Sequence, residues 1–373
     1  MISFEMKIFL LGPCYPYRGG ISDTNEELAQ TLHQQGHTIE VINFKMLYPT
    51  ILFPGTTQYY AKDEKDLDFR NLRLINSINF FSWNKVVKKI NSSKIDVLIS
   101  SHWTSSVSIC MTYINSRVSK KIKKIGLIHN AHPHENLLLS SFFLKRYLRS
   151  LNEYVAFSKA VKEQIEKNSP EKIGKTFFLP VPNKFGKPVE SIVAKKKLKL
   201  CSKTKYLMFF GIIRPYKGLD LLIKAFDLLR KTKNNIELLI VGENYESINN
   251  YQILKEFSNN KKYIRFINKF IDEKMLKYWF SATDIVIQPY KNASQSGVTS
   301  LAINFEKILI TTKTGGLSEL IENEKNGFIC EANFHDIYRT IDKALNCDKN
   351  IVIKNLRSTK KNLSWKKFTK KLF

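Results

Sequence analysis

The sequence lacks the features that define several common classes of protein. Its cysteines are odd in number, none lies in a C-x-x-C pair, and they stand apart at Cys14, Cys110, Cys201, Cys330 and Cys347. This pattern argues against a disulfide framework or a zinc ribbon and fits a reducing cytosol. No apolar run reaches the roughly 18 residues that a membrane-spanning helix needs. The short apolar run at the N-terminus has no cleavage site after it. We therefore expect a cytoplasmic protein that is soluble or peripheral on a membrane.

The sequence is also short of acidic residues. It holds 33 Asp and Glu against 60 Lys and Arg, which gives a net charge of +27. A field of this sign attracts anionic partners, namely phosphorylated ligands, an anionic membrane surface or nucleic acid. The rest of the composition is typical of a globular chain, because 43% of the residues are apolar and 12% are aromatic. A length of 373 residues predicts two or three domains with sizeable cores.

The most informative stretch is 206–226, YLMFFGIIRPYKGLDLLIKAF. A buried-strand pattern opens it, a loop with glycine and proline interrupts it, and apolar residues return at helical spacing from Leu219. Arg214 and Lys217 therefore lie at a predicted helix N-terminus, where free backbone N–H groups and the helix dipole attract anions. We interpret this loop as a seat for a diphosphate. A surface loop with two solvated cations is the alternative.

The N-terminal region predicts a βαβ unit with glycines at its first turn. A strand is expected over 7–11, a helix follows Gly19 and Gly20, and a second strand is expected over 38–43. Glycines without side chains let a ligand approach the backbone closely before the helix. An ordinary turn is the competing interpretation.

A histidine-rich segment follows the predicted strand 125–128. His129 stands at the carboxyl end of that strand, the edge at which open α/β sheets bind ligands, so it is a candidate contact; a packed, hydrogen-bonded histidine is the alternative. His132 and His134 lie nearby but straddle a proline, and no helical His pair four residues apart exists. We therefore predict no metal site here.

A polar loop follows the predicted strand 284–288. It contains Ser294, Gln295, Ser296, Gly297, Val298 and Thr299, just before another predicted helix. Hydroxyl groups together with free N–H donors suit phosphate, ribose or sugar hydroxyls. An ordinary turn is the alternative interpretation.

Residues 137–149 mix bulky apolar side chains with Lys145, Arg146 and Arg149, close in sequence to the basic run 120–124. Apolar side chains beside cations suit an anionic membrane surface or a lipid-linked ligand. A helix wedged into the core fits the pattern equally well.

Prolines and glycines around 180–188 mark a break in the chain. We predict an N-terminal domain over 1–183, a basic linker over 184–203, and a second α/β domain over 204–350, with a C-terminal segment over 351–373. Two α/β halves with glycines at strand ends are typical of nucleotide-binding domains.

The chain resembles the retaining glycosyltransferases of the GT-B fold, in the large group 1 family, also called family 4. The resemblance covers nearly the whole chain and is carried by FFGIIRPYKGLDLLIKAF at 209–226, by SATDIVIQPY and SQSGVTSLAINFEKILITTKTGGLSELI over 281–321, by Gly19-Gly20 and by His129. It implies an α/β fold of two Rossmann-like domains facing a cleft. It also implies a C-terminal helix, anchored by Trp365, that crosses back to the N-terminal domain.

The resemblance further implies roles for single residues. Arg214 and Lys217 would hold the donor diphosphate, Gly19 and Gly20 would admit the phosphate and sugar, and His129 would contact a sugar hydroxyl. The family's paired glutamates fall on Ser294 and Ala302, so both acids are missing here. Hydrogen bonding to the donor is then expected from Gln295, Ser296 and Thr299, with Gly297 and Val298 at the helix start.

The implied activity is transfer of a hexose-type sugar from a UDP- or GDP-linked donor to a lipid-linked or saccharide acceptor, with retention and without a metal or other cofactor. Cell-envelope polysaccharide or glycolipid synthesis on the inner face of the membrane is the expected setting. A sugar-nucleotide epimerase of the same fold is the first alternative, although carboxylates expected around its sugar are absent at Ser294 and Ala302. A nucleic-acid binder is the second, but the cations are dispersed and no base-reading motif is present.

Overall fold

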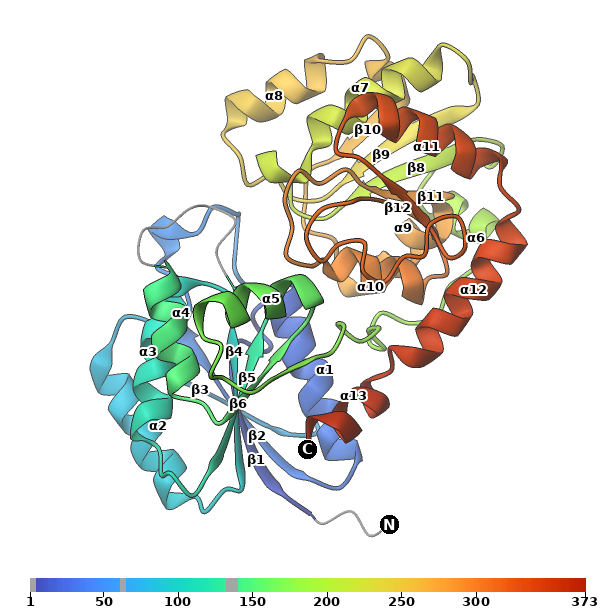
Figure 1. The fold of residues 1–373 in the computed structure, drawn as a ribbon. Helices are drawn as coiled ribbons and strands as arrows, with labels where there is room; N and C mark the ends of the chain where they lie inside the picture. The colour runs from blue at the N-terminus through green and yellow to red at the C-terminus, as the bar shows by residue number, and fades with distance from the viewer. Residues whose placement is uncertain (1–4, 61–64, 132–139) are drawn as a thin grey trace. The chain divides into compact units, whose positions relative to one another are not determined.

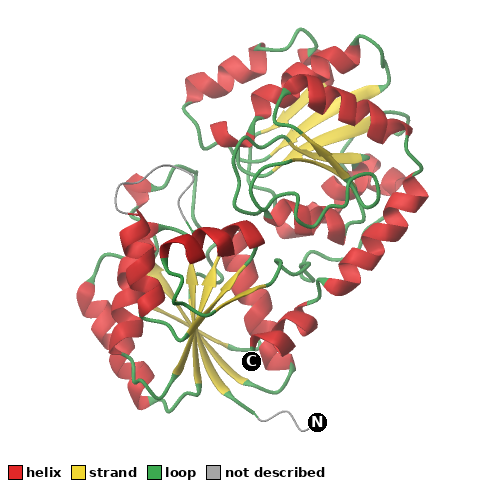
Figure 2. Ribbon diagram, viewed as in Figure 1, coloured by secondary structure: helices red, strands yellow, loops and turns green. Residues whose placement is uncertain are grey.

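The computed structural model describes residues 5–60, 65–131 and 140–373. The chain divides into two compact units (Figure 1). The first contains Met1–Leu179 together with Trp365–Phe373, and the second contains Pro180–Ser364. Both alternate strands and helices along the chain (Figure 2), as the sequence predicts.

The first unit is built on a parallel sheet with the strand order β3-β2-β1-β4-β5-β6-β7. Its strands are β1 (Lys7–Leu11), β2 (Thr38–Met46), β3 (Arg70–Asn76), β4 (Val97–His102), β5 (Lys123–Ile128), β6 (Glu153–Ala156) and β7 (Gly174–Thr176). Its helices are α1 (Gly20–Gln34), α2 (Phe80–Ser92), α3 (Ser105–Arg117), α4 (Ser140–Arg149), α5 (Lys159–Asn168) and α13 (Trp365–Leu372), with the short η1 (Thr50–Leu52).

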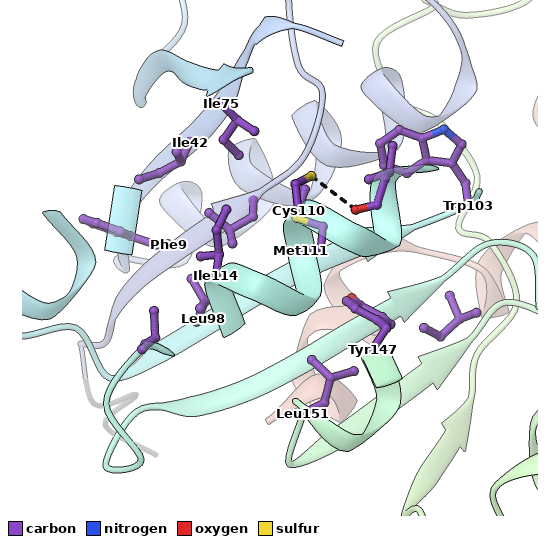
Figure 3. Close-up of a cluster of buried hydrophobic side chains, with 14 of the residues drawn as sticks. Phe9, Ile42, Ile75, Leu98, Trp103, Cys110, Met111, Ile114, Tyr147 and Leu151 are labelled. Atoms are coloured by element: carbon purple, nitrogen blue, oxygen red, sulfur yellow. Dashed lines mark hydrogen bonds between the residues drawn. The ribbon is translucent and has the colours of Figure 1, made fainter. Parts of the chain in front are cut away.

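Two hydrophobic cores flank this sheet. Successive side chains of a strand point to opposite faces. Phe9 of β1 therefore joins the core of α2, α3 and α4, whereas Ile8 joins the core of α1 and α13. Figure 3 shows the first core, in which side chains from β1, β2 and β4 meet Met111 and Ile114 of α3 and Tyr147 of α4.

The second unit has a parallel sheet with the order β10-β9-β8-β11-β12-β13. Its strands are β8 (Lys205–Phe210), β9 (Ile236–Val241), β10 (Ile264–Ile267), β11 (Ile285–Gln288), β12 (Ile308–Thr312) and β13 (Phe328–Cys330). Its helices are α6 (Ser191–Lys197), α7 (Leu219–Arg230), α8 (Ile248–Glu256), α9 (Glu273–Ala282), α10 (Gly297–Asn304), α11 (Phe334–Asn346) and α12 (Lys349–Asn362), with η2 (Pro215–Lys217) and η3 (Lys261–Tyr263). Helices α6, α9 and α10 share one core, while α7 and α11 pack together.

In each sheet, successive strands are added towards one edge and later strands towards the other edge. In the first unit the reversal lies between β1 and β4, and in the second between β8 and β11. Open α/β sheets bind ligands outside the carboxyl ends of the strands at such a switch point. A ligand-binding site is therefore expected at the loops that follow these strands.

The structure differs from the sequence-based expectation at β3. The sequence predicts an irregular loop over 47–68 and helical spacing from Ser77, with no strand between them. The strand is hidden in the sequence because it lies at the sheet edge, where Arg70 and Arg73 interrupt the apolar pattern. Helix α2 begins at Phe80, because the side chain of Asn79 accepts the backbone N–H groups of Phe81 and Ser82.

The expected linker 184–203 instead belongs to the second unit. It contains α6, which packs against α9 and buries Ala194. Lys184 also pairs with Glu273, with 2.6 Å between the ammonium nitrogen and a carboxylate oxygen. The basic composition hid this helix because its two buried residues are Ala194 and Lys195, whose ammonium group bonds the carbonyl of Thr204.

The expected C-terminal segment 351–373 is divided between the units. Helix α12 belongs to the second unit, and residues from Trp365 onward belong to the first. Trp365, Phe368 and Leu372 lie buried in the core that α1 covers.

Candidate functional site

The loop between β8 and α7 is shaped by Gly218. This residue has φ 65°, in the left-handed region that favours glycine. A Cβ atom there would lie only 2.0 Å from the carbonyl oxygen of Pro289. Glycine therefore lets η2 turn directly into α7 while packing against the loop after β11. The turn places Lys217 at the N-terminal end of α7, as the sequence predicts.

Lys217 is a buried cation at this switch point. Only 7% of it is exposed, and its ammonium nitrogen lies 5.0 Å from the centre of the Tyr290 ring. The same nitrogen lies 3.2 Å, and a methyl carbon of Val298 3.7 Å, from the position of a Cβ on Gly211. Among the residues that the structure describes, no carboxylate pairs with Lys217. A buried ammonium group without a counter-charge is costly, so an anionic ligand would stabilise it.

Arg214 lies in the same loop but faces a different neighbour. Its guanidinium carbon lies 5.5 Å from the centre of the Tyr245 ring, in the loop after β9. Burial raises the pKa of the nearby Glu246 carboxyl, whereas the charge of Arg214 acts in the opposite direction. The two predicted cations therefore contact different aromatic side chains on either side of β8.

The N-terminus of α10 is held by a buried amide. Gln288, at the end of β11, donates to the Ser296 hydroxyl over 2.8 Å and accepts from the Thr299 hydroxyl over 3.0 Å. The Ser296 oxygen also accepts the backbone N–H of Val298 over 3.2 Å, which caps the helix. Gln288 and Thr299 are buried, whereas Ser296 is half-buried, so the network extends from the interior to the loop surface.

This network changes the expected roles in the loop. Ser296 and Thr299 were expected to bond the donor, but both side chains already bond Gln288. Gln295 is half-buried and forms no hydrogen bond with the described residues. Gln295 therefore keeps its amide for a ligand, and Ser296, whose oxygen accepts in both of its hydrogen bonds, keeps its O–H donor.

The N-terminal edge of α1 is open. Gly19 caps the helix with φ 108°, a left-handed conformation that side chains disfavour, and the N-cap carries no side-chain hydrogen bond from the described residues. A Cβ on Gly19 or on Gly20 would meet no described atom within 4 Å. The backbone at the first switch point is therefore bare, as the βαβ interpretation predicts.

His129 lies directly after β5 and is 2% exposed. Its ring packs on Phe157 with 4.7 Å between ring centres, and its Nε2 atom has no hydrogen-bond partner among the described residues. Burial, assisted by His102, lowers the pKa of His129 to about 3. The ring is therefore neutral near pH 7, with one nitrogen able to donate and the other able to accept a hydrogen bond. The expected neighbours His132 and His134 lie outside the described residues.

The loop after β2 packs aromatic side chains at the carboxyl edge of the sheet in the first unit, and we call this group the aromatic wall. The hydroxyl of Tyr48 accepts from the Trp103 indole over 2.7 Å, and Gln58 bonds both backbone groups of Tyr48. The Tyr17 and Tyr59 rings lie 4.9 Å apart. This segment is therefore packed onto the sheet of its own unit.

Two family models match the chain in succession. The model described as glycosyl transferases group 1 matches residues 191–363, and the model described as glycosyltransferase family 4 matches residues 18–174. Each match falls within one of the two structural units. The two matches together identify the chain as a glycosyltransferase of the GT-B fold, with the group 1 model matching its second unit.

Relatives support this assignment along the whole chain. An uncharacterized glycosyltransferase of Methanocaldococcus jannaschii is 23% identical over 97% of this chain and 95% of its own length. The sucrose-phosphate synthase of Thermosynechococcus elongatus has a TM-score of 0.79 at 15% identity, covering 98% of this chain and 97% of its own. Anabaena HepE in complex with UDP-glucose has a TM-score of 0.76 at 14% identity, covering 99% and 98%. At such identities the structural likeness shows the fold.

Within this glycosyltransferase, the structure brings some of the predicted residues together. Lys217 and Val298 gather around Gly211 in the second unit, with Ser296 and Thr299 on the same α10 N-terminus. Gly19, Gly20 and His129 lie at the carboxyl edge of the sheet in the first unit. The sequence interpretation missed Gln288 and Tyr290, although a glutamine closing an apolar strand is a signal for a buried polar role.

The two positions that lack the family's glutamates are both buried. Ser294 is 7% exposed, and its neighbour Ala293 packs tightly on Gly315. Ala302 is fully buried in the hydrophobic core beneath α10. Neither serine nor alanine has a carboxylate, so the glycosyltransferase has no acidic group at these two buried positions.

Proposed function

We propose that this glycosyltransferase moves a hexose-type sugar from a UDP- or GDP-linked donor to a lipid-linked or saccharide acceptor, with retention of configuration. The observation that carries the proposal is Lys217, a buried ammonium group without an ion pair among the described residues, beside the N-terminus of α10. The nucleotide-sugar assignment is supported by the likeness to Anabaena HepE, whose structure contains UDP-glucose.

The chemistry follows from charge. When the bond between sugar and phosphate breaks, negative charge develops on the leaving diphosphate, and fixed donors stabilise that charge most effectively. Lys217 and Arg214 supply cations, and the N-termini of α7 and α10 supply backbone N–H dipoles. Because these groups meet the charge of the leaving group, the proposed reaction needs no metal ion.

Retention is proposed from what the second unit offers to the sugar. Glycosyl transfer passes through an oxocarbenium-like transition state. Ser294 and Ala302 provide no carboxylate to act as nucleophile. Attack on the same face as the departing group, with the leaving phosphate accepting the proton of the acceptor, fits this arrangement.

The setting we propose is the inner face of the cell membrane, in envelope polysaccharide or glycolipid synthesis. Within 5–60, 65–131 and 140–373, no helix is long and apolar enough to cross a bilayer. The net charge of +27 favours an anionic surface and a phosphorylated, lipid-linked acceptor.

The experiment is a screen of the purified protein against a panel of UDP- and GDP-sugars, reading nucleotide release with and without polyprenyl-phosphate or saccharide acceptors. We expect one donor to release nucleotide far faster than the others, and NMR of the product to show the anomeric configuration of that donor. Inverted product would overturn the proposed retention. Conversion of the donor to an isomeric sugar nucleotide without transfer would favour the epimerase.

A further inference from the structure

Three neighbouring helices of the first unit contain no acidic residue. Helix α3 contacts both α2 and α4, so the three lie side by side on one face of the sheet (Figure 1). Their sequences include no Asp or Glu, yet they carry Lys85, Lys88, Lys89, Arg117, Lys145, Arg146 and Arg149, of which Lys89 pairs with Glu40 of β2. Solvated helices usually mix charges of both signs, so a surface with this excess of cations is suited to an anionic partner.

The same face exposes large apolar side chains. Phe81 is 76% exposed and Phe142 is 51% exposed; we define the apolar rim as Ile78, Phe80, Phe81, Ile109 and Phe142, each more than a third exposed. Single exposed apolar residues are ordinary, but a gathered set marks an interaction surface. The rim comes from three helices and the turn before α2, which explains why no one segment of the sequence revealed it.

A groove of about 420 Å³ lies between these helices. Its lining includes Trp83, Ile109, Tyr113, Arg117, Phe142 and Arg146. The Arg117 guanidinium lies 3.7 Å from the centre of the Tyr113 ring, and that of Arg146 lies 5.5 Å from the Phe142 ring. Among the described lining residues none is acidic, so both cations face an apolar channel without a counter-charge.

Helix α4 has two different faces, which resolves the two interpretations left open by its sequence. Leu144, Tyr147 and Leu148 are buried in the core, as Figure 3 shows for Tyr147. Phe142 and Arg146 lie on the groove side. The helix is therefore wedged into the core on one side and presents an apolar, cationic surface on the other.

We propose that this groove and the apolar rim dock the protein on a membrane by binding an anionic phospholipid. Arg117 and Arg146 pair with the lipid phosphate, the groove receives an acyl chain, and the rim enters the headgroup region. The proposal deepens the membrane setting of the proposed function but does not depend on which sugar is transferred. It assigns the contact to α2, α3 and α4, rather than to 137–149 and the basic run 120–124 alone.

The test is sedimentation of the full chain with vesicles of phosphatidylglycerol and phosphatidylcholine, compared with vesicles of phosphatidylcholine alone. We expect binding to the mixed vesicles that weakens at high salt, because neither burial nor surface charge alone is enough for stable attachment. The charge reversal Arg146→Glu should reduce partitioning by about tenfold or more, since each cation near an anionic surface contributes on that scale. The variant Phe81→Ser/Phe142→Ser should reduce it further.

A matched control carries the same changes in the second unit. Ile351→Ser/Lys354→Glu alters an exposed apolar side chain and an exposed lysine of α12. We expect it to bind vesicles as the wild type does. Melting temperatures of all variants show that each is folded.

Occupation of the groove has its own measurement. Trp83 lines the groove, so phosphatidylglycerol with brominated acyl chains should quench its fluorescence, and Trp83→Phe should lose that part of the quenching. Four outcomes overturn the proposal: no binding at low salt, equal binding to both vesicle types, quenching independent of Trp83, or a dimer in solution that Phe81→Ser abolishes. Nucleotide-sugar binding by the same wild-type preparation, measured by calorimetry, separates failure of docking from failure of the proposed glycosyl transfer.

Discussion

The two sheets have the same kind of topology, but different side chains lie at the carboxyl ends of their strands. In the second unit the edge is closed and charged: Lys217 is buried, and Gln288 ties the start of α10 to the end of β11. In the first unit the edge is bare at Gly19 and carries the neutral ring of His129 beside an aromatic wall. A fixed set of cations suits a diphosphate, which UDP- and GDP-linked sugars share. A neutral, aromatic edge suits sugars and acceptors, which differ between enzymes.

Removing the buried cation Lys217 is the strongest test of the difference between the two edges. We expect Lys217→Ala to lower turnover by about two orders of magnitude or more, the loss typical of one transition-state donor. Arg214→Ala should lose less, because its guanidinium stands over Tyr245 rather than beside α10. Steady-state nucleotide release with the preferred donor measures both.

The control for this prediction is Lys354→Ala, which removes an exposed lysine of α12. It should leave turnover unchanged. A folded Lys217→Ala protein with wild-type turnover would contradict the assignment of the diphosphate to this edge.

The second prediction concerns the amide that positions α10. We expect Gln288→Leu to raise the KM for the donor about tenfold and to destabilise the fold by about 1–3 kcal/mol, because two hydroxyls lose their partner. Calorimetric nucleotide affinity and thermal unfolding measure the two effects separately.

The triple variant Gln288→Leu/Ser296→Ala/Thr299→Val separates positioning from stability. Replacing both partners of the buried Gln288–Thr299 bond by apolar groups restores part of the stability that one deletion costs, whereas Ser296→Ala also removes the cap of α10, so the double variant Gln288→Leu/Thr299→Val serves as the reference that keeps the cap. We therefore expect the melting temperature to recover in part while the KM stays high. If donor affinity recovered together with stability, Gln288 would have a structural role only.

The sequence predicted the strand–loop–helix units well because each has its own signal. The apolar run of β8, the glycine turn at Gly218 and the helical spacing of α7 lie within one short stretch. The glycines before α1 are equally local. Such elements need no knowledge of the remaining chain.

Features made by distant segments were not predicted. Strand β3 is defined by pairing with β2, and α6 by its buried Ala194 and Lys195 among other lysines. The Gln288 network joins two elements across the loop, and the apolar rim collects residues from α2, α3 and α4. The spacing of apolar residues within one segment does not show which distant segments that segment will contact.

The third prediction tests whether the buried ring of His129, at the carboxyl edge of the first sheet, is neutral in the folded protein. The folded protein holds the pKa of His129 at about 3, whereas an unfolded histidine titrates near its ordinary value of about 6.5. The unfolded chain therefore binds the proton first, so stability falls as the pH drops from about 6.5 towards 3. The slope from this group is at most about 1.4 kcal/mol per pH unit.

Chemical denaturation at several pH values measures this slope. His129→Asn should flatten it over that range, whereas His335→Asn, at an exposed position of α11, should leave it as in the wild type. An unchanged slope in His129→Asn would mean that His129 takes up its proton in the folded state.

The smallest expected effect is that of a chelator. If the cations of the second edge meet the charge of the leaving diphosphate, excess EDTA should leave nucleotide release unchanged, because no step of the proposed reaction passes through a metal. In the proposed reaction Lys217 and Arg214 would neutralise the diphosphate in place of a divalent ion. Loss of activity that a divalent ion restores would contradict it and would direct attention to His132 and His134. In that case His132→Ala should abolish the restored activity while Lys217→Ala reduces it only in part, and the charge that drives the reaction would belong to the first unit rather than the second.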